Sequence, residues 1–306
     1  MDPGIDDALA LMLALRSPEV RILGVTTVAG NAPVEVTGSN ARRVLEHLGA
    51  GDIPVAPGAA KPLRRPLEDA LGYHGPDGLG DSSLPPPAVP LHPEPAWDFL
   101  SDAASDAPGE ITLLATGPLT NVAHAFERHR HLPDLLAGVV IMGGAYGLTP
   151  YGRGNRTHAA EFNIWQDPEA ARAVFRSGAV IFAVGLDVSM DPAACLAAGH
   201  LELIKSGTTP AAWLAAQLVE YEVRHHGCCR MHDPLALAVL LDPSLFSFVP
   251  AQVEVVVTNG AERGATRMSP PDSLQDSVGS CRPAQIASAV DGGRFLDLFV
   301  RRILDE

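Results

Sequence analysis

Apolar segments typical of buried strands alternate along this chain with segments typical of helices. The clearest strand is Val20–Ala29 (VRILGVTTVA), in which β-branched and apolar residues occupy nearly every position, as in a strand with helices against both faces. Shorter segments of the same kind follow at Ile53–Ala56, Ile111–Ala115, Gly138–Met142, Val180–Val184 and Val253–Val257. This alternation predicts an α/β fold with an open, Rossmann-like, mainly parallel sheet flanked by helices.

The helices expected around this sheet include a very apolar one at the start of the chain. Ile5–Leu15 is apolar almost all round and ends before Pro18, as does a helix packed inside an α/β protein. Further helices are predicted at Pro33–Leu48, Trp97–Ala104, Pro168–Arg176, Leu235–Leu241 and Arg294–Leu304, with a helix-rich region at Pro192–His226. The chain has 306 residues, 46% of them hydrophobic, and shows no repeat or internal boundary. Residues 1–306 are therefore predicted to form a single domain.

Regular periodicity is lost between Lys61 and Pro95. This segment carries Tyr73-His74 between glycines and is rich in proline towards its end. So long an irregular stretch in a compact domain is either a functional loop or a mobile surface loop. The residues leave both readings open, with His74 either facing a site or merely exposed.

Composition and charge argue against several classes of partner. The 22 basic and 36 acidic residues give a net charge of −14, whereas nucleic acids and anionic membranes are bound by clustered Lys and Arg. No apolar run approaches the roughly 20 residues that span a bilayer, and no secretory signal is recognisable at the N-terminus. We expect a cytoplasmic protein without nucleic acid or membrane partners. Its cysteines are expected to be reduced: Cys195, Cys228, Cys229 and Cys281.

Acidic residues are concentrated where the first helix begins. Asp2, Asp6 and Asp7 surround a Pro-Gly turn, and the start of a helix offers unpaired N–H groups and the positive end of its dipole. Aspartates at these positions are often only helix caps. A cluster of carboxylate oxygens also suits a hard divalent cation, whereas zinc prefers nitrogen and sulfur ligands.

Other polar residues are expected at the same edge of the sheet, because α/β folds bind ligands beyond the carboxyl ends of their strands. The sequence contains neither a phosphate-binding loop nor the G-x-S-x-G motif of serine hydrolases. Carboxylates and amides bind vicinal hydroxyl groups, so a neutral, polyhydroxylated ligand such as a sugar is the leading substrate class. The residues concerned are Asp2, Asp6, Asp7, Asn31, His74, Thr116, Met142, Asn155, Glu161, Asn163, Asp187, His232 and Asp233.

Seven segments, in order, resemble the nucleoside hydrolases of the inosine–uridine-preferring type. They are DPGIDDALAL, VTTVAGN, ATGPLTNVA, IMGGAY, AEFNIWQDPEAA, VGLDVS and MHDPLALA. The resemblance implies hydrolysis of the N-glycosidic bond of ribonucleosides to ribose and free base. It also implies a tightly held Ca²⁺ and assembly into homodimers or homotetramers.

The resemblance also assigns roles to single residues. The metal ligands would be the carboxylates of Asp2, Asp7 and Asp233 and the carbonyl of Thr116. Asp2 would also deprotonate the attacking water, and His232 would protonate the departing base. The nucleoside would be bound by Asp6, Asn31 and Asn163 at the ribose hydroxyls, Asn155 and Glu161 at the 5′-hydroxyl, Met142 under the ring and His74 beside the base. Carboxylates and amides suit this chemistry, because glycoside cleavage passes through an oxocarbenium-like, positively charged transition state.

The sequence departs from the family pattern at its beginning. Family members carry a strand before the DPGIDD motif, ending in a further aspartate two positions before the one matched by Asp2. Here that first strand is missing. Either the native protein starts further upstream, which we favour, or the chain is a catalytically weakened form.

Two rival functions remain open. One is a calcium-dependent nucleoside- or sugar-binding protein without turnover, and the other, suggested by His232-Asp233, is an HD-type phosphohydrolase. The sequence leaves the choice between purine and pyrimidine bases open.

Overall fold

The computed structural model describes residues 1–271 and 282–305, so Cys281 lies outside the described residues. Its main sheet has six strands in the order β3-β4-β5-β10-β8-β9. From β3 to β10 neighbouring strands run parallel, whereas β8 is antiparallel to β10 and β9 to β8. The strands are β3 (Thr112–Ala115), β4 (Gly138–Met142), β5 (Ile181–Val184), β8 (Phe246–Val255), β9 (Thr266–Ser269) and β10 (Ala284–Val290).

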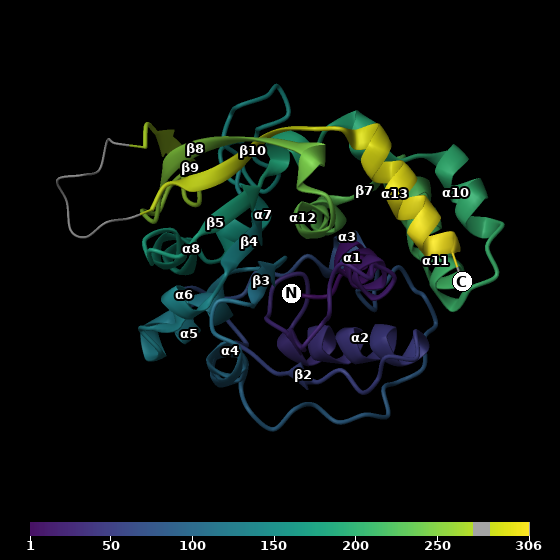
Figure 1. Ribbon diagram of the computed structural model, residues 1–306. Coiled ribbons are helices and arrows are strands. Elements are labelled where there is room, and N and C mark those ends of the chain that lie inside the picture. The colour runs from purple at the N-terminus through teal and green to yellow at the C-terminus, as the bar shows by residue number, and fades with distance from the viewer. Residues whose placement is uncertain (272–281, 306) are drawn as a thin grey trace.

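Helices cover both faces of this sheet (Figure 1). Along β4, Val140 and Met142 pack into a core with α1 and α12, whereas Val139 and Ile141 pack into a second core with α5 and α8. This alternation is the period of two that a strand imposes. The longer helices are α1 (Ile5–Leu15), α2 (Val34–His47), α4 (Ala96–Asp106), α5 (Thr120–Arg128), α8 (Pro168–Phe175), α10 (Ala198–Lys205), α11 (Pro210–His226), α12 (His232–Leu241) and α13 (Gly292–Leu304).

Short elements complete the described structure. The helical turns are α3 (Leu71–His74), α6 (Leu132–Leu135), α7 (Phe162–Gln166), α9 (Leu186–Ser189), η1 (Pro192–Ala194) and η2 (Pro243–Leu245). Two further two-stranded sheets are formed by β1 (Val25–Thr26) with β2 (Val55–Ala56) and by β6 (Cys195–Leu196) with β7 (Cys229–Arg230). The predicted α/β fold is thus confirmed, and α1 has the predicted bounds. Among the described residues, no helix is long and apolar enough to cross a membrane.

The predicted strand Val20–Ala29 is mostly irregular, with only Val25–Thr26 in β1. The physical reason is that only Val25 and Thr26 find partners on a neighbouring strand, in β2. On the other side of β1 lies a cavity of about 380 Å³, lined by Val20–Thr26, by residues 111–114 leading into and along β3, and by Met1, Ala10 and Leu237, among others. A strand with a neighbour on one side makes half of the hydrogen bonds that a strand with two neighbours makes. The cavity therefore lies between β1 and β3, which belong to separate sheets.

The cavity predicts opposite effects for two alanines of α1. Ala10 is 2% exposed and lines the cavity, so Ala10→Leu should fill space and raise the free energy of unfolding by roughly 0.5–2 kcal/mol. Ala8 is 1% exposed and packs in the core away from the cavity lining, so Ala8→Leu should lower it by roughly 1–3 kcal/mol through overpacking. Urea unfolding of this chain and both variants measures the difference. Equal destabilisation by the two leucines would contradict the prediction.

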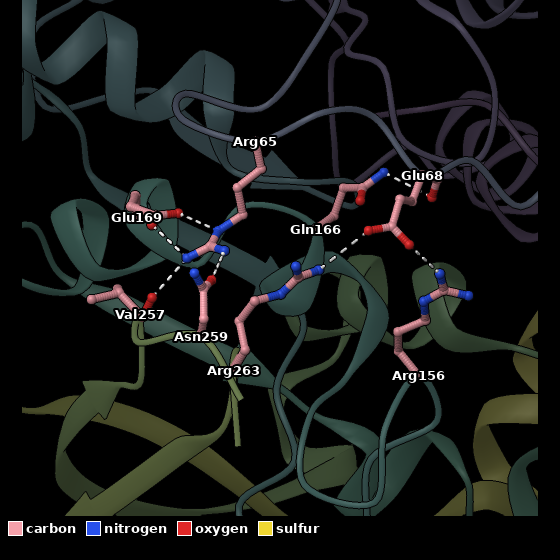
Figure 2. A network of polar contacts seen from close by, with 8 residues as sticks. All are labelled: Arg65, Glu68, Arg156, Gln166, Glu169, Val257, Asn259 and Arg263. Atoms are coloured by element: carbon pink, nitrogen blue, oxygen red, sulfur yellow. Dashed lines mark hydrogen bonds and ion pairs between the residues drawn. The ribbon is translucent and has the colours of Figure 1, made fainter. Parts of the chain in front are cut away.

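The irregular segment Lys61–Pro95 is held to the rest of the molecule by ion pairs (Figure 2). Arg65 donates to both carboxylate oxygens of Glu169 on α8, at 2.8 and 3.0 Å, and to the carbonyl of Val257 at 2.7 Å. Glu68 pairs with Arg156 at 2.9 Å and with Arg263 at 3.8 Å. Bidentate arginine–carboxylate pairs of this kind fix geometry. The segment that leads to α3 and His74 is therefore anchored at its start.

The expectation that all cysteines are reduced is wrong for two of them. Cys195 and Cys228 form a disulfide, with their Cα atoms 6.1 Å apart, and Cys229 is free and buried. The cause is the antiparallel β6–β7 ladder, which pairs Cys195 with Arg230 and Leu196 with Cys229. This short ladder brings Cys228 beside a residue far from it in the sequence.

Candidate active site

Three carboxylates meet where α1 and α12 begin. Asp6 and Asp7 lie in the first turn of α1, and Asp233 is the second residue of α12. One oxygen from each lies within 4.8 Å of the others. Asp7 and Asp233 are buried, whereas Asp6 is partly exposed. Tight apolar packing between the two helices brings together aspartates that are far apart in the sequence.

Asp7 is fixed by donors from three segments. Its Oδ2 accepts from the backbone N–H of Gly4 at 3.1 Å and from Asn31 Nδ2 at 3.4 Å. Its Oδ1 accepts from Thr116 Oγ1 at 2.8 Å. Thr116 follows β3, so the carboxyl end of this strand lies against the cluster, as expected of the ligand-binding edge of such a sheet.

Asp2 lies beside this cluster and has one oxygen without a partner. Its Oδ2 accepts from the backbone N–H of Asn31 at 2.7 Å. Its Oδ1 is buried and makes no hydrogen bond. Two glycines leave room for this carboxylate, because a Cβ at Gly30 or at Gly117 would lie 2.1 or 2.2 Å from its oxygens. A buried carboxylate oxygen without a donor is costly unless a cation compensates it.

Burial and mutual repulsion raise the pKa values of these carboxyls. For Asp2 and Asp6, burial is the largest cause and the charge of Asp7 the next. For Asp233, burial is followed by the charges of Asp6, Asp7 and Asp2. A divalent cation among the oxygens would reverse this balance, and the all-oxygen donor set suits a hard cation. The residues present therefore fit a bound metal ion.

Two amides predicted to line a sugar converge on the same place. Asn31 Nδ2 donates to the backbone carbonyl of Asp2 at 3.3 Å, besides its contact with Asp7. Asn163 Nδ2 donates to the carbonyls of Thr116, at 2.9 Å, and of Met142, at 3.2 Å. Met142 is the last residue of β4 and is buried. The carbonyl of Thr116, a predicted metal ligand, thus already accepts one hydrogen bond.

Both predicted histidines lie at the site, His74 buried and His232 partly exposed, and both have lowered pKa values. His74 is 7% exposed, and its Nδ1 accepts from the backbone N–H of Ile5 at 3.2 Å, so the reading of His74 as merely exposed is wrong. Burial is the main reason why its pKa is lowered to about 3, and the charge of His232 contributes. Burial also lowers the pKa of His232 to about 4. Nδ1 of His232 is 2.8 Å from Ser189 Oγ.

Glu161 and Asn155 are engaged with backbone groups. Glu161 is 2% exposed and accepts from the N–H groups of Gly144, Asn163 and Ile164 at 3.1, 2.8 and 3.1 Å. Asn155 is exposed, and its Oδ1 accepts from the N–H of Phe162 at 2.9 Å. Glu161 therefore lies against Asn163, whereas Asn155 reaches the site only through the start of α7.

The sequence alone assigns no role to several residues at this site. Ser189 positions His232, and its place in the VGLDVS segment was the available signal. Asp187 accepts from the N–H groups of Tyr146 and Leu148 and so holds the loop after β4. Glu222 on α11 is 2% exposed. Its sequence context, a helix that also carries exposed charged residues, does not indicate that this glutamate is buried.

Comparisons with known proteins identify the family of this chain. The family model "Inosine-uridine preferring nucleoside hydrolase" matches residues 1–297. The pyrimidine-specific ribonucleoside hydrolases RihA of Citrobacter koseri and Salmonella agona are each 37% identical to this chain, over 99% of it and 96% of their own length.

Solved structures of nucleoside hydrolases share the fold. A plant nucleoside hydrolase has a TM-score of 0.91 at 32% identity, covering 100% of this chain and 98% of its own. The purine-preferring ribonucleoside hydrolase of Gardnerella vaginalis has a TM-score of 0.90 at 32% identity, covering 99% and 96%. The chain therefore belongs to the nucleoside hydrolase family, whose members are N-glycosyl hydrolases that act on ribonucleosides.

Proposed function

We propose that this protein hydrolyses the N-glycosidic bond of ribonucleosides to ribose and free base, with Ca²⁺ held by Asp2, Asp7, Asp233 and the carbonyl of Thr116. The observation that carries the proposal is the buried, unpartnered Oδ1 of Asp2 beside the cluster of Asp6, Asp7 and Asp233. Carboxylates and carbonyls at this density favour calcium over zinc. When bound, the cation supplies positive charge that orients vicinal hydroxyls and lowers the pKa of a water molecule.

The aspartates and amides act on the sugar and the water. Asp2 takes a proton from the attacking water, whose oxygen forms the new bond to the anomeric carbon. Asp6 is partly exposed within the cluster and accepts from ribose hydroxyls. The oxygens of Asn31 and Asn163 face the same sugar, with Met142 beneath it. Negative and dipolar groups stabilise the positive charge that develops on the ribose as the bond to the base breaks.

The departing base leaves with the electron pair of the broken bond and needs a proton. His232 is proposed to supply it from its imidazolium form, which the lowered pKa makes the minor form at pH 7, with His74 beside the base. Since Nδ1 of His232 faces Ser189 Oγ, Nε2 is the ring nitrogen left for the base. Glu161 and Asn155 are proposed to hold the 5′-hydroxyl, for which each would give up a hydrogen bond to a backbone N–H group.

Residues 1–297 match one family model, which supports the proposal of a single domain. A cytoplasmic homodimer or homotetramer remains part of the proposal.

A reducing-sugar assay with uridine, cytidine, inosine, adenosine and guanosine tests the activity. We expect ribose to be released from at least one of them in the presence of Ca²⁺. The relatives named above include both pyrimidine-specific and purine-preferring enzymes, so the panel also determines the preferred base. Calcium-dependent binding of nucleosides without release of ribose would instead support a binding protein.

A further inference from the structure

A buried carboxylate on α11 has one oxygen without a partner. Glu222 is 2% exposed, and its Oε1 makes no hydrogen bond. Its Oε2 accepts only a long hydrogen bond, 3.5 Å, from the hydroxyl of Tyr73. Buried carboxylates without donors are rare, because desolvation of the charge is not repaid. The free oxygen therefore calls for a donor that the described residues do not supply.

The surroundings of Glu222 point to the base of the substrate rather than to its sugar. Tyr73 precedes His74, and their rings meet edge to face at 5.0 Å. The ring of Tyr73 also stacks on that of His226 at 4.2 Å, with 9° between the planes. Aromatic side chains of this kind are the usual platforms for nucleobases. On the other side, the pKa of Asp6 is raised by burial, by Asp7 and then by the charge of Glu222. Glu222 thus adjoins the acidic cluster and the aromatic rings together.

We propose that Glu222 is a specificity-determining residue whose Oε1 accepts a hydrogen bond from an N–H on the base of the bound nucleoside. The inference rests on the proposed function. Burial raises the pKa of Glu222 to about 7, so above this pH the carboxylate is mainly ionised and only accepts hydrogen bonds. It therefore selects bases that present a donor, such as N3–H of uracil, N1–H of hypoxanthine or the exocyclic amine of cytosine. Tyr73 holds the other oxygen and so leaves one acceptor for this contact.

Paired substrates that differ only in this N–H test the proposal. The pairs are uridine with 3-methyluridine, inosine with 1-methylinosine and cytidine with N4,N4-dimethylcytidine, measured as kcat/KM at pH 8. The unmodified protein should cleave the preferred parent roughly 10–100-fold faster than its methylated partner. In Glu222→Ala the parent should lose most of this advantage, while the methylated partner changes little. p-Nitrophenyl riboside has no base N–H, so its hydrolysis should be unaffected.

Two further variants keep the test decisive. Glu222→Gln retains the volume of the side chain and a neutral acceptor. On a logarithmic scale, its loss of kcat/KM for the parent substrate should be roughly half of the loss in Glu222→Ala. This variant decides the matter if the alanine variant does not fold. Glu220→Ala removes a carboxylate from the same helix, where it is 41% exposed and paired with Lys205 and Arg224. It should leave every ratio unchanged.

The failures can be told apart. Equal losses on parent and methylated substrates, or an equal loss on p-nitrophenyl riboside, would overturn the role of Glu222 and leave the proposed function standing. No release of ribose from any nucleoside by the unmodified protein would overturn the proposed function and this inference with it.

Discussion

Replacing His232 with alanine is expected to slow the release of uracil or hypoxanthine by roughly 10²–10⁴, the usual worth of general acid catalysis. The base departs as an anion unless it is protonated, whereas p-nitrophenolate departs readily without a proton. Hydrolysis of p-nitrophenyl riboside by the same variant should therefore change little. Parallel measurements of kcat on the two substrates give the comparison.

Controls separate this role from damage to the cation site. Asp6→Asn should slow both substrates alike, because Asp6 acts on the ribose that they share. Ser189→Ala removes the partner of His232 Nδ1 and should reproduce part of the selective loss. Equal losses on both substrates for His232→Ala would show that His232 only supports Asp233. His74 would then be the next residue to test as the acid.

Replacing Asp233 with alanine is expected to abolish metal binding and to reduce the hydrolysis of both substrates by roughly 10³-fold, since a bound cation contributes several kcal/mol of stabilisation to the transition state. Asp233 supplies one of the three clustered oxygens, and its removal leaves a weaker ligand set. Elemental analysis should find about one calcium per chain in the unmodified protein, because sites rich in carboxylates bind this ion tightly. The variant should contain almost none.

A surface carboxylate provides the matched control. Glu202 on α10 is 74% exposed, and Glu202→Ala should keep both the calcium and the activity. Stoichiometric zinc in the unmodified protein would contradict the assignment of the ion. Full calcium content in Asp233→Ala would remove this residue from the ligand set.

The sequence predicted most of the sheet and its helices because the relevant forces are local. Segments such as Gly138–Met142 are apolar at every position, and the structure buries every residue of this strand. Val20–Ala29 has the same composition but mostly lacks strand structure, because only Val25 and Thr26 pair with a neighbouring strand. The strand β8 begins at Phe246, before the predicted start at Val253, because pairing with β10 extends it, and it ends at Val255 instead of Val257.

The candidate site was predictable only in part. The aspartates of α1 are adjacent in sequence, and their clustering follows from the helix start. Asp233 was expected at the same edge of the sheet, but its role as a ligand came from the family resemblance, because helix packing between α1 and α12 has no local signal. The pKa values of the histidines depend on burial, which a sequence motif does not record. The unpartnered oxygen of Glu222 is likewise a property of the folded chain.

The disulfide described above makes the two sides of the site mechanically unequal. Cys195 and Cys228 enclose a segment that contains α10 and α11, so the helix that carries Glu222 is covalently tied to β6. The opposite side, with Tyr73 and His74, is tethered by the ion pairs of Arg65 and Glu68. Ion pairs break and re-form readily, whereas a covalent bond does not. A nucleoside that needs room to enter would therefore displace α3 and its loop, while α11 stays in place.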